Sequence, residues 1–280
     1  MVERHPFLTA LAHLVLILGI LIVALPIWIT FVASTHPVEN ILRAPIPIWP
    51  GDRLLENYRQ VLFEGSVAAG PVGRMMFNSL VMALGIALGK IAISILSAFA
   101  IVYFRFPLRM LCFWTIFITL MLPVEVRIVP TYAVVADLGL LNSYLGLTVP
   151  LIASATATFL FRQFCLTVPD ELTEAALIDG AGPLRFFWAI LLPLSRTNLA
   201  ALFVILFIYG WNQYLWPLLV TTEEDMLTVV VGIKRMVEVA EEQPRWNFVM
   251  ATTLLAMLPP VTVVLLMQRW FVKGLIETEK

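Results

Sequence analysis

The stretch GIALGKIA, residues 85–92, places two glycines before a lysine, as does a loop that binds the phosphates of ATP. Such a loop needs four residues between its glycines, and a serine or threonine after the lysine to bind magnesium. Here three residues separate Gly85 from Gly89, and Ile91 follows Lys90. The stretch therefore predicts no ATP hydrolysis. We expect instead that the two glycines let another helix approach closely.

Three charged residues lie inside otherwise apolar segments. A charge such as Lys90 in mid-membrane costs roughly 2.5–3.5 kcal/mol on insertion scales and usually faces the interior of the protein. Glu125 and Arg127 lie between Pro123 and Pro130, each of which disturbs a helix. In a structural role, Lys90 forms an internal ion pair, with Glu125 as candidate partner, or donates hydrogen bonds to carbonyl groups, and Arg127 marks a helix end at the outer interface. In a functional role these residues line a substrate path, where Arg127 would bind phosphate through its planar fork of donors.

The stretch YGWNQYLWP offers amides and aromatic rings to a hydroxylated substrate. In a continuous helix, Tyr209, Asn212, Gln213 and Trp216 share one face. A belt of aromatic residues at the membrane edge explains Trp216 but not the paired amides. The pattern therefore predicts a polar substrate path along this face, with Asn78 as a further member.

Histidine and cysteine offer no catalytic or metal-binding site. The three histidines lie within the first 36 residues without a carboxylate at a suitable spacing, and the two cysteines have no CxxC arrangement. The net charge of −1 argues against nucleic acid as a partner. The sequence thus predicts no metal site, no catalytic residue and no cofactor in this chain.

The composition predicts an all-α membrane protein. The chain is 60% hydrophobic and 13% charged, whereas soluble domains carry about 25% charged residues. A membrane span needs about 20 apolar residues in a helix. We predict a single transmembrane domain over residues 1–280 whose six spans lie near residues 12–33, 77–103, 111–136, 145–164, 199–220 and 248–270. The first run is too long for the core of a signal peptide and is predicted to be retained as an anchor.

Short basic loops predict the orientation of the chain. RFPLR follows the second span and QRWFVKG ends the sixth, and such loops favour the cytoplasmic side. Both termini are therefore predicted to be cytoplasmic, and so is the loop 167–198.

This loop is more polar than its surroundings and reads as two short helices joined by a turn. Pro169 suits the first position of a helix, Gly180 suits a left-handed cap, and Pro183 begins a second helix that Pro193 ends. On physical grounds alone, an amphipathic helix lying on the membrane surface remains equally open.

Small, acidic and apolar residues recur in this loop at fixed spacing. They are Glu174, Ala175, Ala176, Asp179, Gly180, Ala181, Phe187 and Pro193. Their pattern resembles the EAA loop of the permeases of binding-protein-dependent ABC importers, and the likeness to the maltose-type group extends over the whole chain. Stretches such as SAFAIVYFRFPLR and FIYGWNQYLWPLL are similar to the permeases of sn-glycerol-3-phosphate uptake systems.

The resemblance implies a type I ABC importer permease in a bacterial inner membrane, with the loop as a cytoplasmic coupling helix. Its partners would be a homologous second permease, an ATPase dimer that binds ATP and magnesium, and an extracytoplasmic solute-binding protein. The implied substrate is sn-glycerol-3-phosphate, together with glycerophosphodiesters. One alternative within the family is a sugar or oligosaccharide.

Two other classes of protein are disfavoured by the sequence. A self-sufficient secondary transporter would need an inverted repeat and a carboxylate for a coupling ion within the membrane, and only Glu125 offers such an acid. A membrane-embedded enzyme would need paired acid, base or metal ligands, which the scattered histidines do not supply.

Overall fold

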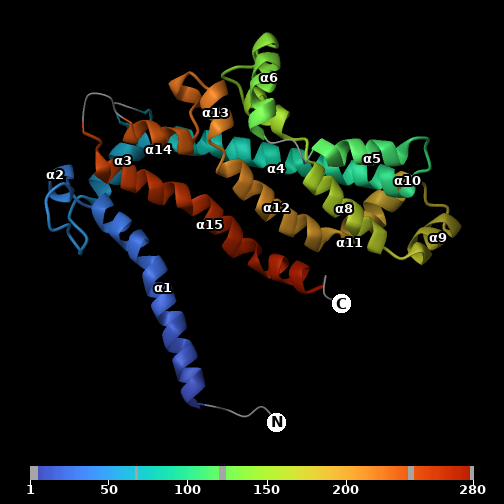
Figure 1. Cartoon of the computed structure of the whole chain (residues 1–280), viewed down its shortest axis with the longest axis horizontal. Helices are drawn as coiled ribbons and strands as arrows, with labels where there is room; N and C mark the ends of the chain where they lie inside the picture. The colour runs from blue at the N-terminus through green and yellow to red at the C-terminus, as the bar shows by residue number, and fades with distance from the viewer. Residues whose placement is uncertain (1–5, 67–68, 120–123, 239–242, 278–280) are drawn as a thin grey trace. The chain divides into compact units, whose positions relative to one another are not determined.

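The computed structural model describes residues 6–66, 69–119, 124–238 and 243–277, without the side chains of residues 6, 124, 125 and 270–277. The regular elements of the described part are helices, apart from one isolated bridge between Ser66 and Ala69 (Figure 1). It divides into two compact units, Met1–Arg74 with Gly232–Leu258, and Met75–Val231 with Pro259–Lys280.

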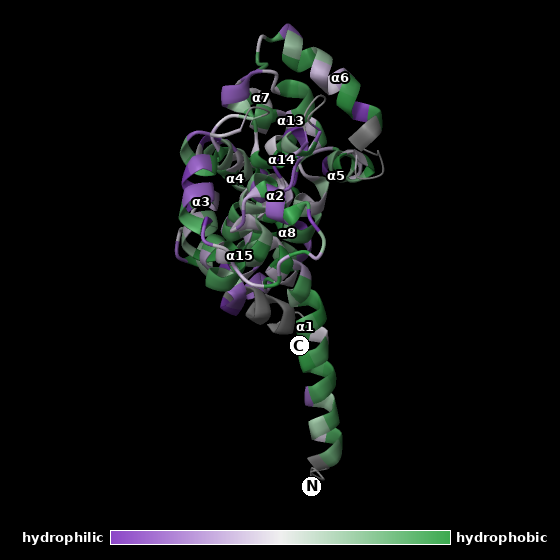
Figure 2. Ribbon diagram, turned by 90° about the vertical axis from the view of Figure 1, so that its left-hand side faces the viewer, coloured by the Kyte–Doolittle hydropathy of each residue, from purple (hydrophilic) through white to green (hydrophobic). Residues whose placement is uncertain are grey.

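The first unit is built around a long apolar helix. Its elements are α1 (Pro6–Ser34), α2 (Val38–Ile41), α3 (Leu54–Phe63), the first residues of α4 (Val72–Tyr103), the last turns of α14 (Val229–Val237) and the first half of α15 (Trp246–Glu277). Figure 2 shows α1 hydrophobic along nearly its whole length, and most of its large apolar side chains are exposed. A helix that is apolar on all sides is typical of a membrane span.

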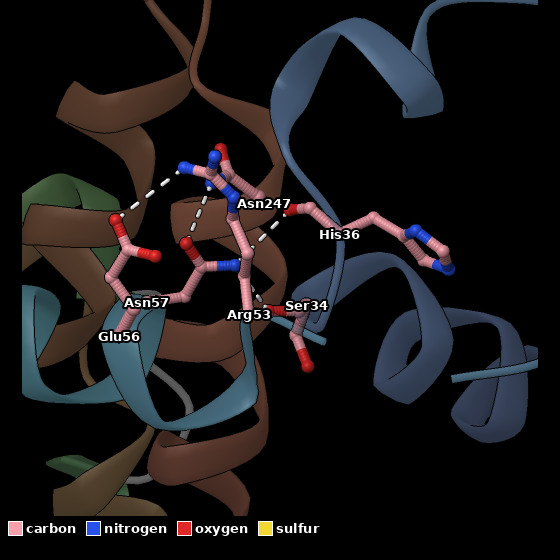
Figure 3. Close-up of polar contacts among 6 residues, drawn as sticks. All are labelled: Ser34, His36, Arg53, Glu56, Asn57 and Asn247. Carbon is pink, nitrogen blue, oxygen red and sulfur yellow. Dashed lines mark hydrogen bonds and ion pairs between the residues drawn. The ribbon is translucent and has the colours of Figure 1, made fainter. Parts of the chain in front are cut away.

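Buried amides join three elements of the first unit (Figure 3). The Asn57 Nδ2 on α3 donates to the carbonyl oxygens of Ser34, at 2.9 Å, and His36, at 3.1 Å. Its Oδ1 accepts from the Nδ2 of Asn247 on α15 at 3.2 Å. Asn57 therefore holds the end of α1 and the start of α15 through one side chain.

The second unit contains the remaining helices. They are the rest of α4, α5 (Arg109–Ile118), α6 (Val124–Asp137), α7 (Tyr144–Thr148), the 3-10 helix η2 (Val149–Leu151), α8 (Ala155–Thr167), α9 (Asp170–Ile178), α10 (Pro183–Phe186), the π-helix η3 (Phe187–Leu191), α11 (Leu192–Leu194), α12 (Arg196–Trp211), α13 (Leu215–Val220), the 3-10 helix η4 (Glu224–Met226), the start of α14 and the second half of α15.

Glycines let neighbouring backbones pack directly against α4. A Cβ at Gly210 of α12 would lie 2.9 Å from the Cα of Ala83, so the two helices touch through their backbones. A Cβ at Gly85 would lie 2.8 Å from the Thr148 side chain, at the end of α7, and a Cβ at Gly89 would lie 2.5 Å from the Ile152 side chain. The space that the two glycines leave is therefore filled by side chains of another segment, as predicted for a close approach.

The described residues contain fewer candidate spans than the six predicted, so that number remains a prediction. Among the described residues, three helices are long and apolar enough to cross a membrane: Phe7–Ser34, Val72–Tyr103 and Trp246–Arg269. Two bent pairs could each form one more span: Tyr144–Leu151 with Ala155–Thr167, bent by 50°, and Pro183–Leu194 with Arg196–Trp211, bent by 72°. The structure thus offers three to five candidate spans.

The predicted third span, residues 111–136, contains two described helices, and residues 120–123 between them lie outside the described residues. Of its described residues, α5 ends at Ile118 and α6 begins at Val124, and Figure 1 shows α6 turned away from the line of α5. Pro123 disfavours a helix that continues from α5 into α6, because proline lacks the backbone N–H that the preceding turn needs, whereas Pro130 lies inside α6 without ending it.

Candidate functional site

The polar loop folds as two short helices with a closed turn between them. α9 begins at Asp170, directly after Pro169, which is extended at φ −60° and ψ 139°. Pro169 therefore precedes the helix by one residue instead of occupying its first position, as the sequence predicted. Asp170 and Glu171 place negative charge at the positive end of the helix dipole.

Gly180 ends α9 in the left-handed conformation, with φ +69°, as predicted. The N–H of Gly180 donates to the carbonyl oxygen of Leu177 at 3.1 Å, and the N–H of Ala181 donates to that of Ala176 at 2.8 Å. This pair of bonds is a Schellman motif, which satisfies the last carbonyls of the helix. Pro183 then begins α10. We call residues 170–187, which end one residue after α10, the α9–α10 segment.

The predicted motif residues lie on two sides of the loop. Glu174, Ala175, Asp179 and Gly180 are exposed. By contrast, Ala176 is 5% exposed and Phe187 is 3% exposed. Ala181 and Pro193 are half-buried. One face of the α9–α10 segment is therefore free to contact a partner while the other packs on the protein.

The inner face of the α9–α10 segment packs on the C-terminal end of α4 (Figure 1). The rings of Tyr103 and Phe186 are 5.2 Å apart, and those of Phe99 and Phe187 are 5.0 Å apart. Beside them lies an apolar cavity of about 210 Å³ whose lining includes Phe104 and Ala176. Sequence reasoning did not single out Phe99 and Tyr103, although the aromatic residues of AFAIVYF and the Phe-Phe pair at 186–187 are a signal for such a contact.

The second helix of the loop ends one residue later than predicted. It continues from Pro183 to Leu194 through a π-helical turn, so Pro193 does not end it. The direction changes by 72° at Ser195, whose hydroxyl donates to the carbonyl oxygen of Leu192 at 2.9 Å. Pro193 is tolerated because the wider π-turn rearranges the bonds that an α-helix would need there.

Lys90 is buried in the second unit against an aromatic ring. Its side chain on α4 places Nζ 4.0 Å from the ring centroid of Tyr209 on α12, and the residue is 7% exposed. Cation–π contacts of this kind stabilise by about 0.5–2 kcal/mol, less than the cost of inserting a lysine into mid-membrane. No described carboxylate lies within ion-pair distance of Lys90. The predicted partner, Glu125, has a side chain outside the described residues.

The four residues of YGWNQYLWP do not share one helical face, which corrects the sequence prediction. α12 ends at Trp211 and α13 begins at Leu215. The Gln213 Nε2 donates to the carbonyl oxygen of Tyr209 at 3.2 Å. The buried Trp216 donates through Nε1 to the carbonyl oxygen of Gly146 at 3.1 Å. Tyr209 and Asn212 remain exposed at the break.

Asn78 is fully buried and has all of its polar groups satisfied. Its Nδ2 donates to the carbonyl oxygens of Asp225, at 2.7 Å, and Leu227, at 2.9 Å. Its Oδ1 accepts from the Tyr144 hydroxyl at 2.8 Å. This geometry indicates that Asn78 holds α4 to the segment before α14. Arg127, by contrast, is exposed on α6.

Sequence comparison identifies the family. Residues 90–277 match the family described as the binding-protein-dependent transport system inner membrane component. The match covers more than half of the chain, which therefore belongs to this family of ABC importer permeases. It is an inner-membrane transport component, and the α9–α10 segment lies within the matched region.

Individual relatives are similar over their whole length. The chain is 62% identical to the sn-glycerol-3-phosphate transport system permease protein UgpE of Brucella melitensis, and 59% identical to the protein of that name from Escherichia coli. In both cases 100% of each chain is covered.

A solved structure supports the fold. It is a crystal structure of a bacterial ABC transporter involved in the import of the acidic polysaccharide alginate, with a TM-score of 0.81 and 21% sequence identity. The similarity covers 97% of this chain and 99% of that chain. The all-helical importer permease fold is therefore confirmed.

Proposed function

We propose that this chain is the permease subunit that carries sn-glycerol-3-phosphate across the inner membrane in an ATP-driven importer. The observation that carries the proposal is the 62% identity, over the full length of both chains, to a permease named for that transport system. The fold alone does not select this substrate, since an alginate importer shares it at 21% identity. Glycerophosphodiesters, which carry the same glycerol phosphate group, are further proposed substrates.

The proposed complex contains three other kinds of subunit. A homologous second permease would enclose the path together with this chain, and an extracytoplasmic solute-binding protein would deliver the substrate. A cytoplasmic ATPase dimer would bind ATP and magnesium, so this chain itself needs no cofactor. Both termini would be cytoplasmic, as the basic loops predict, which puts the α9–α10 segment on the side of the ATPase.

The α9–α10 segment is suited to couple ATP hydrolysis to movement of the spans. Its exposed face, with Glu174 and Asp179, would bind in a groove of the ATPase. Its buried face is fixed by the aromatic contacts of Tyr103 with Phe186 and of Phe99 with Phe187. A movement of the exposed face would therefore move α4 as well, because the aromatic packing joins the two rigidly and no flexible loop lies between them.

The proposed substrate path runs beside the break between α12 and α13. Tyr209, Asn212 and Gln213 would supply its wall, because irregular backbone within a membrane is tolerated where it lines a cavity or is buried in protein. Trp216 and Asn78 would support the wall from behind. Arg127 and Glu125 of α6 are further proposed contacts of the substrate.

Transport by the reconstituted complex tests the proposal. The chain would be purified with its partner subunits, placed in proteoliposomes with ATP inside, and supplied with the binding protein and labelled sn-glycerol-3-phosphate. We expect accumulation that depends on ATP and is competed by glycerophosphodiesters but not by maltose or oligosaccharides. Preferential uptake of a sugar would show that the assigned substrate is wrong. Accumulation by this chain alone would indicate a secondary transporter.

A further inference from the structure

The Lys90 ammonium has few interactions for a charge buried within an apolar helix. It lies in the 19th position of the 32-residue helix α4, and its one described attractive contact is the ring of Tyr209, 4.0 Å from Nζ. The positive charge of Arg127 is near enough to repel it. A lysine ammonium has three N–H donors. No described residue accepts a hydrogen bond from them or forms an ion pair with them. The charge is retained without the partners that usually compensate a buried cation.

The ring of Tyr209 connects this ammonium to the surface of the second unit. Lys90 is 7% exposed, whereas Tyr209 is 37% exposed. Tyr209 lies one helical turn before the break at Asn212, and Asn212 is exposed as well. A rotation of the tyrosine side chain would therefore uncover the ammonium beside the polar break.

We propose that Lys90 binds the phosphate of the substrate within the membrane, and that Tyr209 holds its ammonium when the path is empty. The inference rests on the proposed function, and it assigns charge recognition to one residue of that path. An aromatic face holds a cation weakly, while a phosphate offers charge-assisted hydrogen bonds that are stronger at low dielectric. The ammonium therefore moves from the ring to the phosphate as the substrate arrives, and returns to the ring as it leaves.

Lysine fits this role better than arginine does. Its ammonium is a compact charge on a flexible stem, whereas a guanidinium binds phosphate through two fixed parallel bonds. A transport path needs binding strong enough to admit the substrate and weak enough to release it. We therefore expect Lys90→Arg to retain selectivity for the phosphate and to slow its release.

The test uses the reconstituted complex and labelled sn-glycerol-3-phosphate. We expect Lys90→Met to lower the rate of uptake at least about tenfold, with ATPase activity still stimulated by the loaded binding protein, and Lys90→Arg to retain a clear part of the uptake. Leu88→Met changes an exposed position of the same helix, outside the proposed path, and should transport as the wild type does. If wild-type complexes take up no sn-glycerol-3-phosphate, the proposed function fails and this inference with it. If wild type and Lys90→Met transport equally, only the inference fails.

A chemical rescue tests the proposal even if the Lys90→Met chain does not assemble into the complex. In a chain whose Cys112 and Cys165 are replaced by alanine, Lys90→Cys would be treated with 2-aminoethyl methanethiosulfonate, which rebuilds a cationic side chain of similar length. We expect uptake to recover with this reagent and not with neutral methyl methanethiosulfonate. Equal recovery with both reagents would show that Lys90 only fills space.

An internal ion pair with Glu125 is the competing explanation. It predicts that Glu125→Gln impairs uptake as much as Lys90→Met does, and that the double variant recovers uptake because no unpaired charge remains. Such recovery would overturn the proposal. We expect the double variant to be no better than Lys90→Met alone.

Discussion

The backbone N–H of Ala181 donates to the carbonyl oxygen of Ala176 at 2.8 Å, and this bond closes the turn between α9 and α10. It fixes the side on which each motif residue lies. Ala176 faces inward against the end of α4, while Glu174 and Ala175 face outward. The spacing of the motif thus corresponds to one helical turn, one left-handed residue and a restart at Pro183.

The left-handed Gly180 is predicted to be essential for coupling. Gly180→Val forces a β-branched residue to φ +69°, at a cost of about 1–2 kcal/mol or more. We expect ATP-driven uptake to fall at least about fivefold, since such a cost shifts the equilibrium between the folded and the unfolded turn by about 5- to 30-fold. Uptake and the amount of chain in the membrane should both be measured.

Gly182→Val is the matched control for this variant. Neither glycine has an atom within 4 Å of an added Cβ, but Gly182 is extended, at φ −69° and ψ 166°. Valine before a proline adopts that extended conformation without strain. Equal loss of uptake in both variants would contradict the explanation by backbone conformation.

Glu174→Lys is predicted to abolish uptake without affecting insertion. Glu174 is exposed, so the folded chain tolerates the change, while a reversed charge on the docking face repels its partner. Copurification with the ATPase should be lost. Asp137→Lys makes the same reversal at the exposed end of α6 and should copurify normally. Wild-type uptake by Glu174→Lys would remove this residue from the docking surface.

Asn78→Asp is predicted to destabilise the second unit strongly. The change replaces the NH₂ donor with an oxygen that faces two carbonyl oxygens, at 2.7 and 2.9 Å. We expect a loss of about 3 kcal/mol, because buried groups are left unsatisfied. Tyr144→Phe removes only the third bond and should cost about 1 kcal/mol. Thermal unfolding of the purified chain in detergent would rank the two, and similar Tm values would argue against this role of Asn78.

Asn57 is predicted to contribute far more to the stability of the first unit than the ion pair beside it does. Asn57→Ala leaves the Ser34 and His36 carbonyl oxygens without their donor and should cost about 2–3 kcal/mol. Arg53 and Glu56 form an exposed pair at 3.4 Å, and such pairs are worth about 0–1 kcal/mol. Glu56→Ala should therefore leave the Tm nearly unchanged (Figure 3). A larger shift for Glu56→Ala than for Asn57→Ala would reverse this ranking.

Local backbone chemistry was the part of the site that the sequence predicted well. Gly180 was predicted to be left-handed and Pro183 to begin a helix, and both predictions are confirmed. These features depend on one residue and its immediate neighbours. The close approach at Gly85 and Gly89 was predicted for a similar reason, because a missing side chain leaves room whatever the partner is.

Continuity of the helices was predicted poorly. Tyr209 to Trp216 fit a helical pattern, but Pro217 has no N–H to donate to the carbonyl oxygen of Gln213, and the Gln213 amide bonds back to Tyr209. A pattern of side chains does not reveal such a break. Asn78 was assigned to the path because it is polar and close to an apolar run. Its partners at residues 225 and 227 are distant in sequence, so only the fold shows that its bonds are already taken.

The helix α4 joins two of these contacts through a single rod. Asn78 and Phe99 are 21 residues apart along it, about 32 Å at 1.5 Å per residue, and no proline interrupts it. A rod of this length magnifies small rotations: a tilt of about 5° moves one end by about 3 Å relative to the other. Rocking at the aromatic end would therefore shift the Asn78 end by nearly the diameter of a water molecule, with no bending of the helix itself.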